Sequence, residues 1–241
     1  MLASLLLCAW APKAPPLRIH SIGIIAAVGD TCAFERVPDR PFEWIGPPEA
    51  RFLEISDWGI DDDLTKSVAA ALKPVYATQA ISIEHQDFDT WTYDSLTHHI
   101  RELPMPEVPI DAYLLILRDW RADDIGGSDH SLVGLGVYRR DRPEGRARYG
   151  VFAAFRLILL EPERGRMIAS RAAVLPNGQA PWLPVSASLW PRTENDLTDA
   201  QRDAFRGDFL RLLDAALPNS LAKIGLVTKT VMARRGAAEQ R

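Results

Sequence analysis

The sequence is poor in cysteine, has no excess of charge of one sign, and contains no hydrophobic run of transmembrane length. With 2 Cys in 241 residues it is not a disulfide-stabilised scaffold, and 47% hydrophobic residues exclude a disordered chain. Lysine and arginine (28) nearly balance aspartate and glutamate (32). No basic stripe lies beside stacking aromatic residues, so we expect no nucleic-acid partner. The length suits one large globular domain or two small ones.

The first residues form a short apolar run. Met1–Trp10 (M-L-A-S-L-L-L-C-A-W) has about the length of a signal-peptide core and is shorter than the roughly 20 residues that span a bilayer. A small-x-small triplet ends at Ala11, and residues 12–16 are rich in proline. We therefore predict a leader and linker over residues 1–16 and export to the periplasm or cell envelope. The alternative is a cytoplasmic protein with a packed or frayed N-terminus.

The two cysteines have different surroundings. Leu7 stands directly before Cys8, where a bacterial lipobox has a small residue, so the sequence argues against lipidation of Cys8. Removal of the leader would leave Cys32 without an intrachain disulfide partner. We expect Cys32, close to Phe34, to be a small buried hydrophobic residue.

Hydrophobic periodicity predicts a single α/β (α+β) domain over residues 17–228. Three strand patterns alternate with two helix patterns, then come long strands joined by hairpin-like turns, and last a C-terminal amphipathic helix. This order predicts a mixed sheet with a parallel β-α-β-α-β start and antiparallel C-terminal hairpins. The predicted strands are 17–28, 75–83, 110–117, 131–139, 147–161 and 167–175, and the helices are 61–73, 93–103 and 198–217.

Several segments are predicted to fall outside these regular elements. Residues 31–57 contain several prolines and short strand-like pieces, which favours an irregular hairpin insertion. Residues 118–130 and 176–191 have the composition of loops. Pro218 is expected to end the C-terminal helix, with a shorter helix from Ser220 and a polar tail over residues 229–241.

The order of elements and two phrases support a family resemblance. The strand phrase is V-P-I-D-A-Y-L-L-I-L (residues 108–117), and the turn E-P-E-R-G-R (residues 161–166) leads into M-I-A-S. The arrangement resembles the small α/β domains of bacterial envelope proteins, such as the TolB N-terminal domain and the periplasmic domain of the curli secretion lipoprotein. The resemblance covers about residues 17–216 and implies a mixed α/β domain of an envelope protein. It assigns no functional residue.

Gly29-Asp30-Thr31 follows an apolar strand and is the first candidate catalytic motif. It resembles the G-D-S block of the SGNH hydrolases, with Thr31 at the position of the nucleophilic serine. That family takes its base from a late Asp-x-x-His, and no histidine follows His130 in this chain. A turn that ends the strand explains the same residues.

A second candidate lies in the segment E-H-Q-D-F-D-T (residues 84–90). Strand alternation would place His85, Asp87 and Asp89 on one side, which suits a divalent metal ion. The D-x-D pattern also resembles haloacid-dehalogenase-type phosphatases, but polar residues separate it from the preceding apolar strand. A solvated loop leading to the next helix accounts for the same residues, and we predict no cofactor or metal.

Tryptophans form the third candidate. Several fall in or beside predicted loops together with prolines, and aromatic side chains in loops are typical of protein or glycan contact surfaces. The candidates for a binding surface are Trp58, Trp120, Trp182 and Trp190.

No motif supplies a nucleophile or metal site together with an orienting base. The sequence therefore favours a non-catalytic cell-envelope protein that acts in protein binding or assembly. The alternative is a hydrolase or metal-dependent enzyme that uses Asp30/Thr31 or His85/Asp87/Asp89. The expected partner is an envelope protein, while membrane association and oligomeric state stay open.

Overall fold

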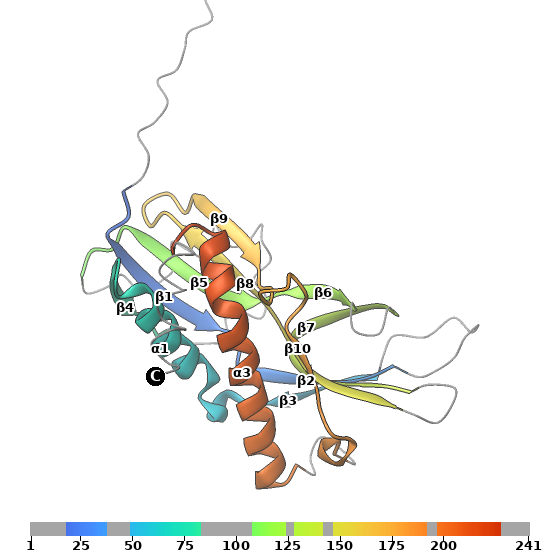
Figure 1. Ribbon diagram of the computed structural model, residues 1–241. Helices are drawn as coiled ribbons and strands as arrows, with labels where there is room; N and C mark the ends of the chain where they lie inside the picture. The colour runs from blue at the N-terminus through green and yellow to red at the C-terminus, as the bar shows by residue number, and fades with distance from the viewer. Residues whose placement is uncertain are drawn as a thin grey trace, which may run out of the picture.

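A computed structural model describes residues 18–37, 49–82, 108–123, 128–141, 147–191 and 197–227. In this part of the chain, ten strands form one curled mixed sheet, and two α-helices lie along one of its faces (Figure 1). The prediction of a single α/β domain with a mixed sheet and a C-terminal helix is confirmed. The expected leader (1–16), the helix at 93–103 and the tail (229–241) lie outside the described residues.

Three strands form one parallel part of the sheet. β1 (Ser21–Ala27) lies between β4 (Ala77–Ala80) and β5 (Ala112–Arg118), and both pairings are parallel. Both faces of β1 are buried, which explains its continuous run of apolar residues. The crossover from β1 to β4 contains α1 (Ile60–Leu72), as predicted.

Two long antiparallel strands hold the rest of the sheet together. β7 (Ser128–Arg140) pairs with the first half of β8 (Arg148–Leu160), whose second half pairs with β5. On its other side β8 pairs first with β10 (Trp182–Pro184) and then with β9 (Met167–Ala172). β8 therefore joins the parallel part of the sheet to the antiparallel part.

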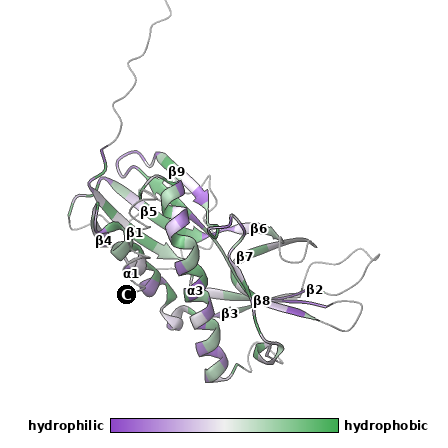
Figure 2. Cartoon of the chain, viewed as in Figure 1, coloured by the Kyte–Doolittle hydropathy of each residue, from purple (hydrophilic) through white to green (hydrophobic). Residues whose placement is uncertain are grey.

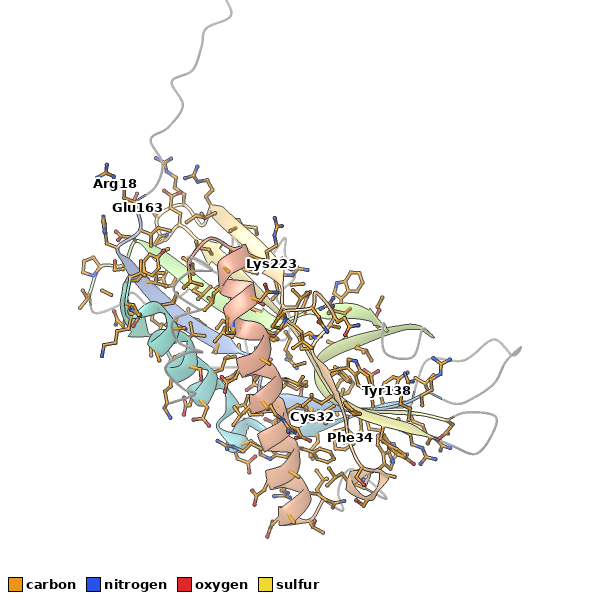
Figure 3. The ribbon with its side chains drawn as sticks, viewed as in Figure 1. Arg18, Cys32, Phe34, Tyr138, Glu163 and Lys223 are labelled. Atoms are coloured by element: carbon orange, nitrogen blue, oxygen red, sulfur yellow. The ribbon has the colours of Figure 1, made fainter. Side chains whose placement is uncertain are left out.

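Residues 31–57 are more regular than the sequence predicts. β2 (Thr31–Val37) and β3 (Glu49–Glu54) are paired antiparallel strands, and β2 also pairs in parallel with β7. Side chains on both faces of β2 are buried: Cys32 and Phe34 pack in the core that contains α3, and Ala33 packs on the opposite face (Figure 3). The predicted strand-like pieces therefore form a regular hairpin that belongs to the sheet, with β3 at its edge and β2 next to it.

Residues 118–130 also differ from the prediction of a loop. β6 (Trp120–Asp123) pairs with the first residues of β7, with a register shift at its end. The four-residue sequence W-R-A-D carries little strand signal of its own. The conformation of these residues is decided by their pairing with β7 and not by their own strand propensity.

The helices begin where the sequence predicts. α1 starts after Gly59 (φ 64°) with three aspartates in its first turn, which favourably face the positive end of the helix dipole. The capping box of Thr198 and Gln201 starts α3 (Asp199–Lys223). Their apolar stripes pack against the sheet and include Leu64, Val68, Leu72, Phe205, Phe209, Leu212, Leu213 and Ala216.

The prediction that Pro218 ends the last helix is wrong, because α3 continues through it to Lys223. Proline removes one helix hydrogen bond, but tertiary contacts hold the following turn. Leu217 and Leu221 are buried, and the Asn219 side chain donates to the carbonyls of Val174 (3.3 Å) and Leu175 (3.1 Å). The short helix expected from Ser220 is the end of α3.

The main core lies between the sheet and the two helices, where the strands are mainly hydrophobic (Figure 2). A smaller cluster covers the opposite face of the parallel strands, and it includes Ile25, Tyr113, Leu115, Leu117, Ile158 and Leu160. Neither described helix combines the length and the hydrophobicity needed to cross a membrane.

Candidate binding surface

Trp58 lies in the core. Its side chain is 8% exposed and its ring lies 6.4 Å from that of Phe209, between centroids. The Trp58 carbonyl accepts a hydrogen bond from Arg206 Nε (2.6 Å), which links α1's start to α3. Trp58 therefore fastens the two helices together and is not accessible to a partner.

Trp182 and Trp190 are half-buried and cover the sheet. The Trp190 ring lies 6.3 Å from that of Phe34 and 6.0 Å from that of Tyr149. Trp182 lies across Gly150, where a Cβ would come within 2.8 Å of the indole. Both side chains use most of their apolar surface to pack against the protein's own residues.

Trp120 is the exception among the candidates. It lies on β6 with 69% of its surface exposed, directly opposite Val133 on β7, which is 41% exposed. Ala122 and Ser131 form the next outward pair and are also exposed. We call these four residues, Trp120, Ala122, Ser131 and Val133, the Trp120 face.

The opposite side of this hairpin holds it to the protein. Leu132 is buried, and Arg121 donates a hydrogen bond to the carbonyl of Ala173 (2.7 Å). Strand alternation then requires the Trp120 face to point outward. Among the described residues β6 pairs with β7 alone.

The base of the hairpin is fixed at Asp119. Its N–H donates to the Ala154 carbonyl (3.0 Å), and its own carbonyl accepts from Gly134 N–H (3.1 Å). The buried Asp119 carboxylate forms an ion pair with Arg156 (3.0 Å). Gly134 has φ 63°, a conformation that favours glycine, where β7 changes partner from β6 to β8. The sheet therefore presents Trp120 on a rigid support.

At the Asp30/Thr31 position, side chains from other elements contact the strand end. Asp61, in the first turn of α1, accepts hydrogen bonds from Val28 N (2.9 Å) and Gly29 N (3.1 Å). The protein's own carboxylate thus occupies the backbone donors at this strand end. Thr31 Oγ1 accepts a hydrogen bond from Arg118, and a guanidinium cannot act as a general base.

The structure does not test the predicted metal site, because His85, Asp87 and Asp89 lie outside the described part of the chain. In the described part, no group of three or more His, Cys, Asp or Glu side chains could hold a metal ion. Cys32 is fully buried, as expected, and burial raises the pKa of its thiol far above the usual value. The thiol is therefore protonated and unreactive at neutral pH.

The sequence predicts Trp120 as a candidate binding residue but does not predict the strand that carries it. The loop prediction for residues 118–130 concealed the strand, and therefore also the Val133 partner. A signal was present, since Trp120 and Ala122 alternate with Arg121, but four residues are too few for a periodicity to stand out.

No family model matches the sequence, and no curated protein matches it. Among solved structures, the chain is similar to a Xanthomonas campestris protein of family DUF330 (13% identity, TM-score 0.36), over 95% of this chain and 93% of that one. It is similar to a neuraminyllactose-binding hemagglutinin homolog from Helicobacter pylori (10%, 0.36), over 96% and 95%. It is also similar to a Neisseria meningitidis lipoprotein (12%, 0.32), over 85% and 99%. At these scores the similarity assigns the chain to no family.

Proposed function

We propose that the protein is a non-catalytic component of the bacterial cell envelope that binds another protein through the Trp120 face. The observation that carries this proposal is the exposed Trp120, paired with Val133 on a hairpin whose base is fixed. Tryptophan is enriched among residues that dominate protein interfaces. A rigid support lowers the entropy lost on binding.

The energetics suit a specific contact of modest size. A tryptophan side chain buries 150–250 Å² when fully covered, so covering the exposed part of Trp120 would contribute about 3 kcal/mol. The second edge of β6 can add main-chain hydrogen bonds to a partner strand. Together these terms support a protein partner that inserts an apolar residue beside Trp120 and pairs with β6.

Site-specific photocrosslinking tests the proposal. A photoreactive amino acid replaces Trp120 in the full chain expressed in its own cells, and Gln179, exposed in a turn, is the matched control. We expect a defined crosslinked protein from position 120 and none from position 179. The purified partner should then lose affinity at least tenfold for Trp120→Ala. Equal crosslinking from both positions, or unchanged affinity, would contradict the proposal.

Export is a separate part of the proposal and is supported by the leader-like residues 1–16. We propose residues 17–228 as the mature folded domain and 229–241 as a polar tail. Cell fractionation with intact-mass measurement tests this: loss of roughly the first 11–14 residues and recovery outside the cytoplasm is expected. An uncleaved chain in the cytoplasm would contradict export, and an added lipid mass on Cys8 would show membrane anchoring.

A further inference from the structure

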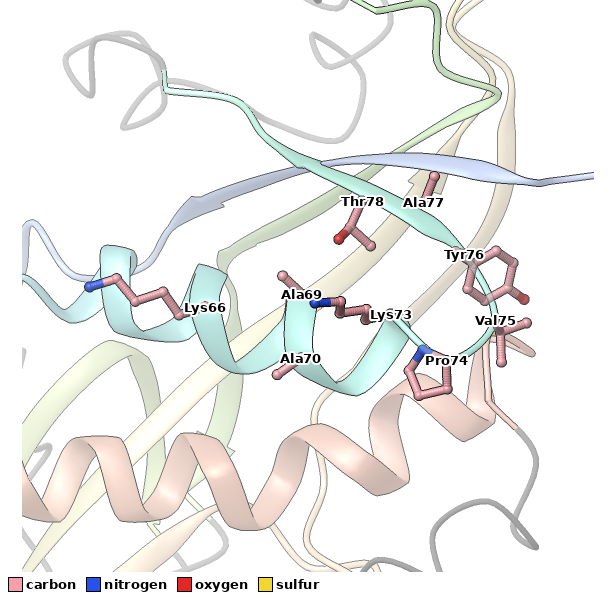
Figure 4. A pocket seen from close by; sticks show the side chains of 9 residues that line it. All are labelled: Lys66, Ala69, Ala70, Lys73, Pro74, Val75, Tyr76, Ala77 and Thr78. Carbon is pink, nitrogen blue, oxygen red and sulfur yellow. The ribbon is translucent and has the colours of Figure 1, made fainter.

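A hollow lies between α1 and β4, on the opposite side of the molecule from β6 in Figure 1. It is open, with a volume of about 900 Å³. Figure 4 shows its lining, which runs from the outer face of α1 across the turn at Pro74 and Val75 to the start of β4. No function proposed above uses this hollow.

On the helix side, the hollow is lined by two small side chains that lie between two lysines. Lys66, Ala69, Ala70 and Lys73 have the spacing i, i+3, i+4, i+7, which places them on one side of α1. The alanines leave room between the lysines, which are separated by about 10 Å along the helix. Both lysines are exposed, so the hollow presents two positive charges over a small-residue floor.

Neither lysine takes part in a buried ion pair among the described residues. The Lys66 side chain is 75% exposed, and its 3.4 Å contact with Asp63 is a surface pair of the kind that contributes little. Lys73 takes part in none of the ion pairs between described residues. An acidic ligand would therefore gain two cationic partners without displacing a strong ion pair.

The strand side of the hollow offers backbone groups. β4 ends the sheet order, and among the described residues it pairs with β1 alone. Ala77 N–H donates to the His20 carbonyl and Ile81 N–H to the Ile24 carbonyl, both at 2.9 Å. In a parallel strand alternate residues face the same neighbour, so Thr78 and Ala80 direct their N–H and C=O groups away from β1. This edge can accept one more strand.

We infer that the hollow binds an extended acidic segment of a partner protein, which adds a strand to the β4 edge and places carboxylates at Lys66 and Lys73. Residues on one face of an extended strand recur about every 7 Å, so carboxylates two or four residues apart come close to the lysine separation of about 10 Å, and the flexible lysine side chains can take up the difference. Val75, 54% exposed at the end of the hollow, offers the segment an apolar contact. This surface is distinct from the Trp120 face.

Fluorescence polarisation tests this inference with a short labelled peptide of alternating valine and glutamate as the probe and the full chain as the receptor. We expect binding, and at least tenfold weaker binding to the Lys66→Glu/Lys73→Glu variant. Lys223→Glu, a charge reversal at an exposed residue on α3, is the matched control and should bind like wild type. A peptide of alternating valine and lysine should not bind.

Amide hydrogen exchange separates strand addition from simple charge attraction. On peptide binding, the amides of Thr78 and Ala80 should gain protection, whereas those of Ala77 and Ile81 already have partners and should change little. Unchanged exchange at Thr78 and Ala80, or equal affinity of the double lysine variant, would overturn the inference. Lysine-dependent binding to phosphatidylglycerol vesicles without peptide binding would also overturn it and assign the lysines to a lipid surface. None of these outcomes bears on the Trp120 face.

Discussion

Asp119 and Arg156 form an ion pair where β5 passes into β6, with the carboxylate buried and the guanidinium about one-third exposed. The pair joins the support of the Trp120 face to the centre of β8. We expect Asp119→Ala to lower the free energy of unfolding by about 2 kcal/mol, because Arg156 loses its partner in a largely desolvated place. Urea unfolding measures this. Arg166→Ala, which breaks the exposed pair with Glu161, should cost less than about 0.5 kcal/mol. Equal losses for the two variants would contradict the prediction.

Gly134 should tolerate alanine poorly. Its φ of 63° is strained for other residues, and an added Cβ would come within 2.9 Å of the Arg118 side chain. We expect Gly134→Ala to destabilise the fold by about 1–2 kcal/mol. Gly207→Ala is the matched control, since it lies in α3 with open space at its Cβ position, and should stabilise by about 0.5–1 kcal/mol. Thermal unfolding of both variants checks the opposite signs.

Truncation of Trp58 should cost much more stability than truncation of Trp120. Trp120→Ala removes an exposed side chain, so we expect the free energy of unfolding to change by less than about 0.5 kcal/mol. Trp58→Ala leaves a cavity next to Phe209 and should cost about 3–5 kcal/mol. Urea unfolding compares them. A large loss of stability in Trp120→Ala would mean that this side chain serves folding and would weaken the binding proposal.

Asp111 should contribute to acid sensitivity. Hydrogen bonds from His20 N (2.8 Å), Ser21 N (3.0 Å) and Ser21 Oγ (3.1 Å) to its carboxylate lower its pKa in the folded protein. A carboxyl with a lowered folded pKa stabilises the fold above its unfolded pKa of about 3.9, and this stabilisation disappears as pH falls through the folded value. Asp111→Asn should therefore be less stable than wild type at pH 7, with a difference that shrinks in strong acid. Urea midpoints across this pH range provide the measurement, and a constant difference would disprove the assignment.

Much of the fold follows from local patterns in the sequence. β1 and β5 are continuous apolar runs, α1 and α3 have apolar stripes with capping residues, and each was predictable without tertiary information. β6 was not, because a short polar strand is stabilised by its pairing with β7. The passage of α3 through Pro218 depends on Asn219 contacts with a distant loop, which no local rule contains.

For the candidate sites, too, the sequence predicts the residues but not the tertiary contacts that decide their roles. The sequence shows that a tryptophan is present but not which of its faces is covered, so Trp58 and Trp120 looked alike. Burial separates them, because one lies against Phe209 and the other points away from the sheet. The Asp61 carboxylate that occupies the Gly29 backbone donor comes from a different element and could not be predicted from the Gly-Asp-Thr motif.

The pairing of β2 with β7 and of β1 with β5 has a kinetic consequence. Cys32 lies opposite Leu135 and Ile22 opposite Ala112, so the central pairings close loops of roughly 100 residues. Folding rates fall as contacting residues lie farther apart in the chain, because loop closure costs entropy before the contacts form. The nascent chain should stay unfolded until most of it has been synthesised.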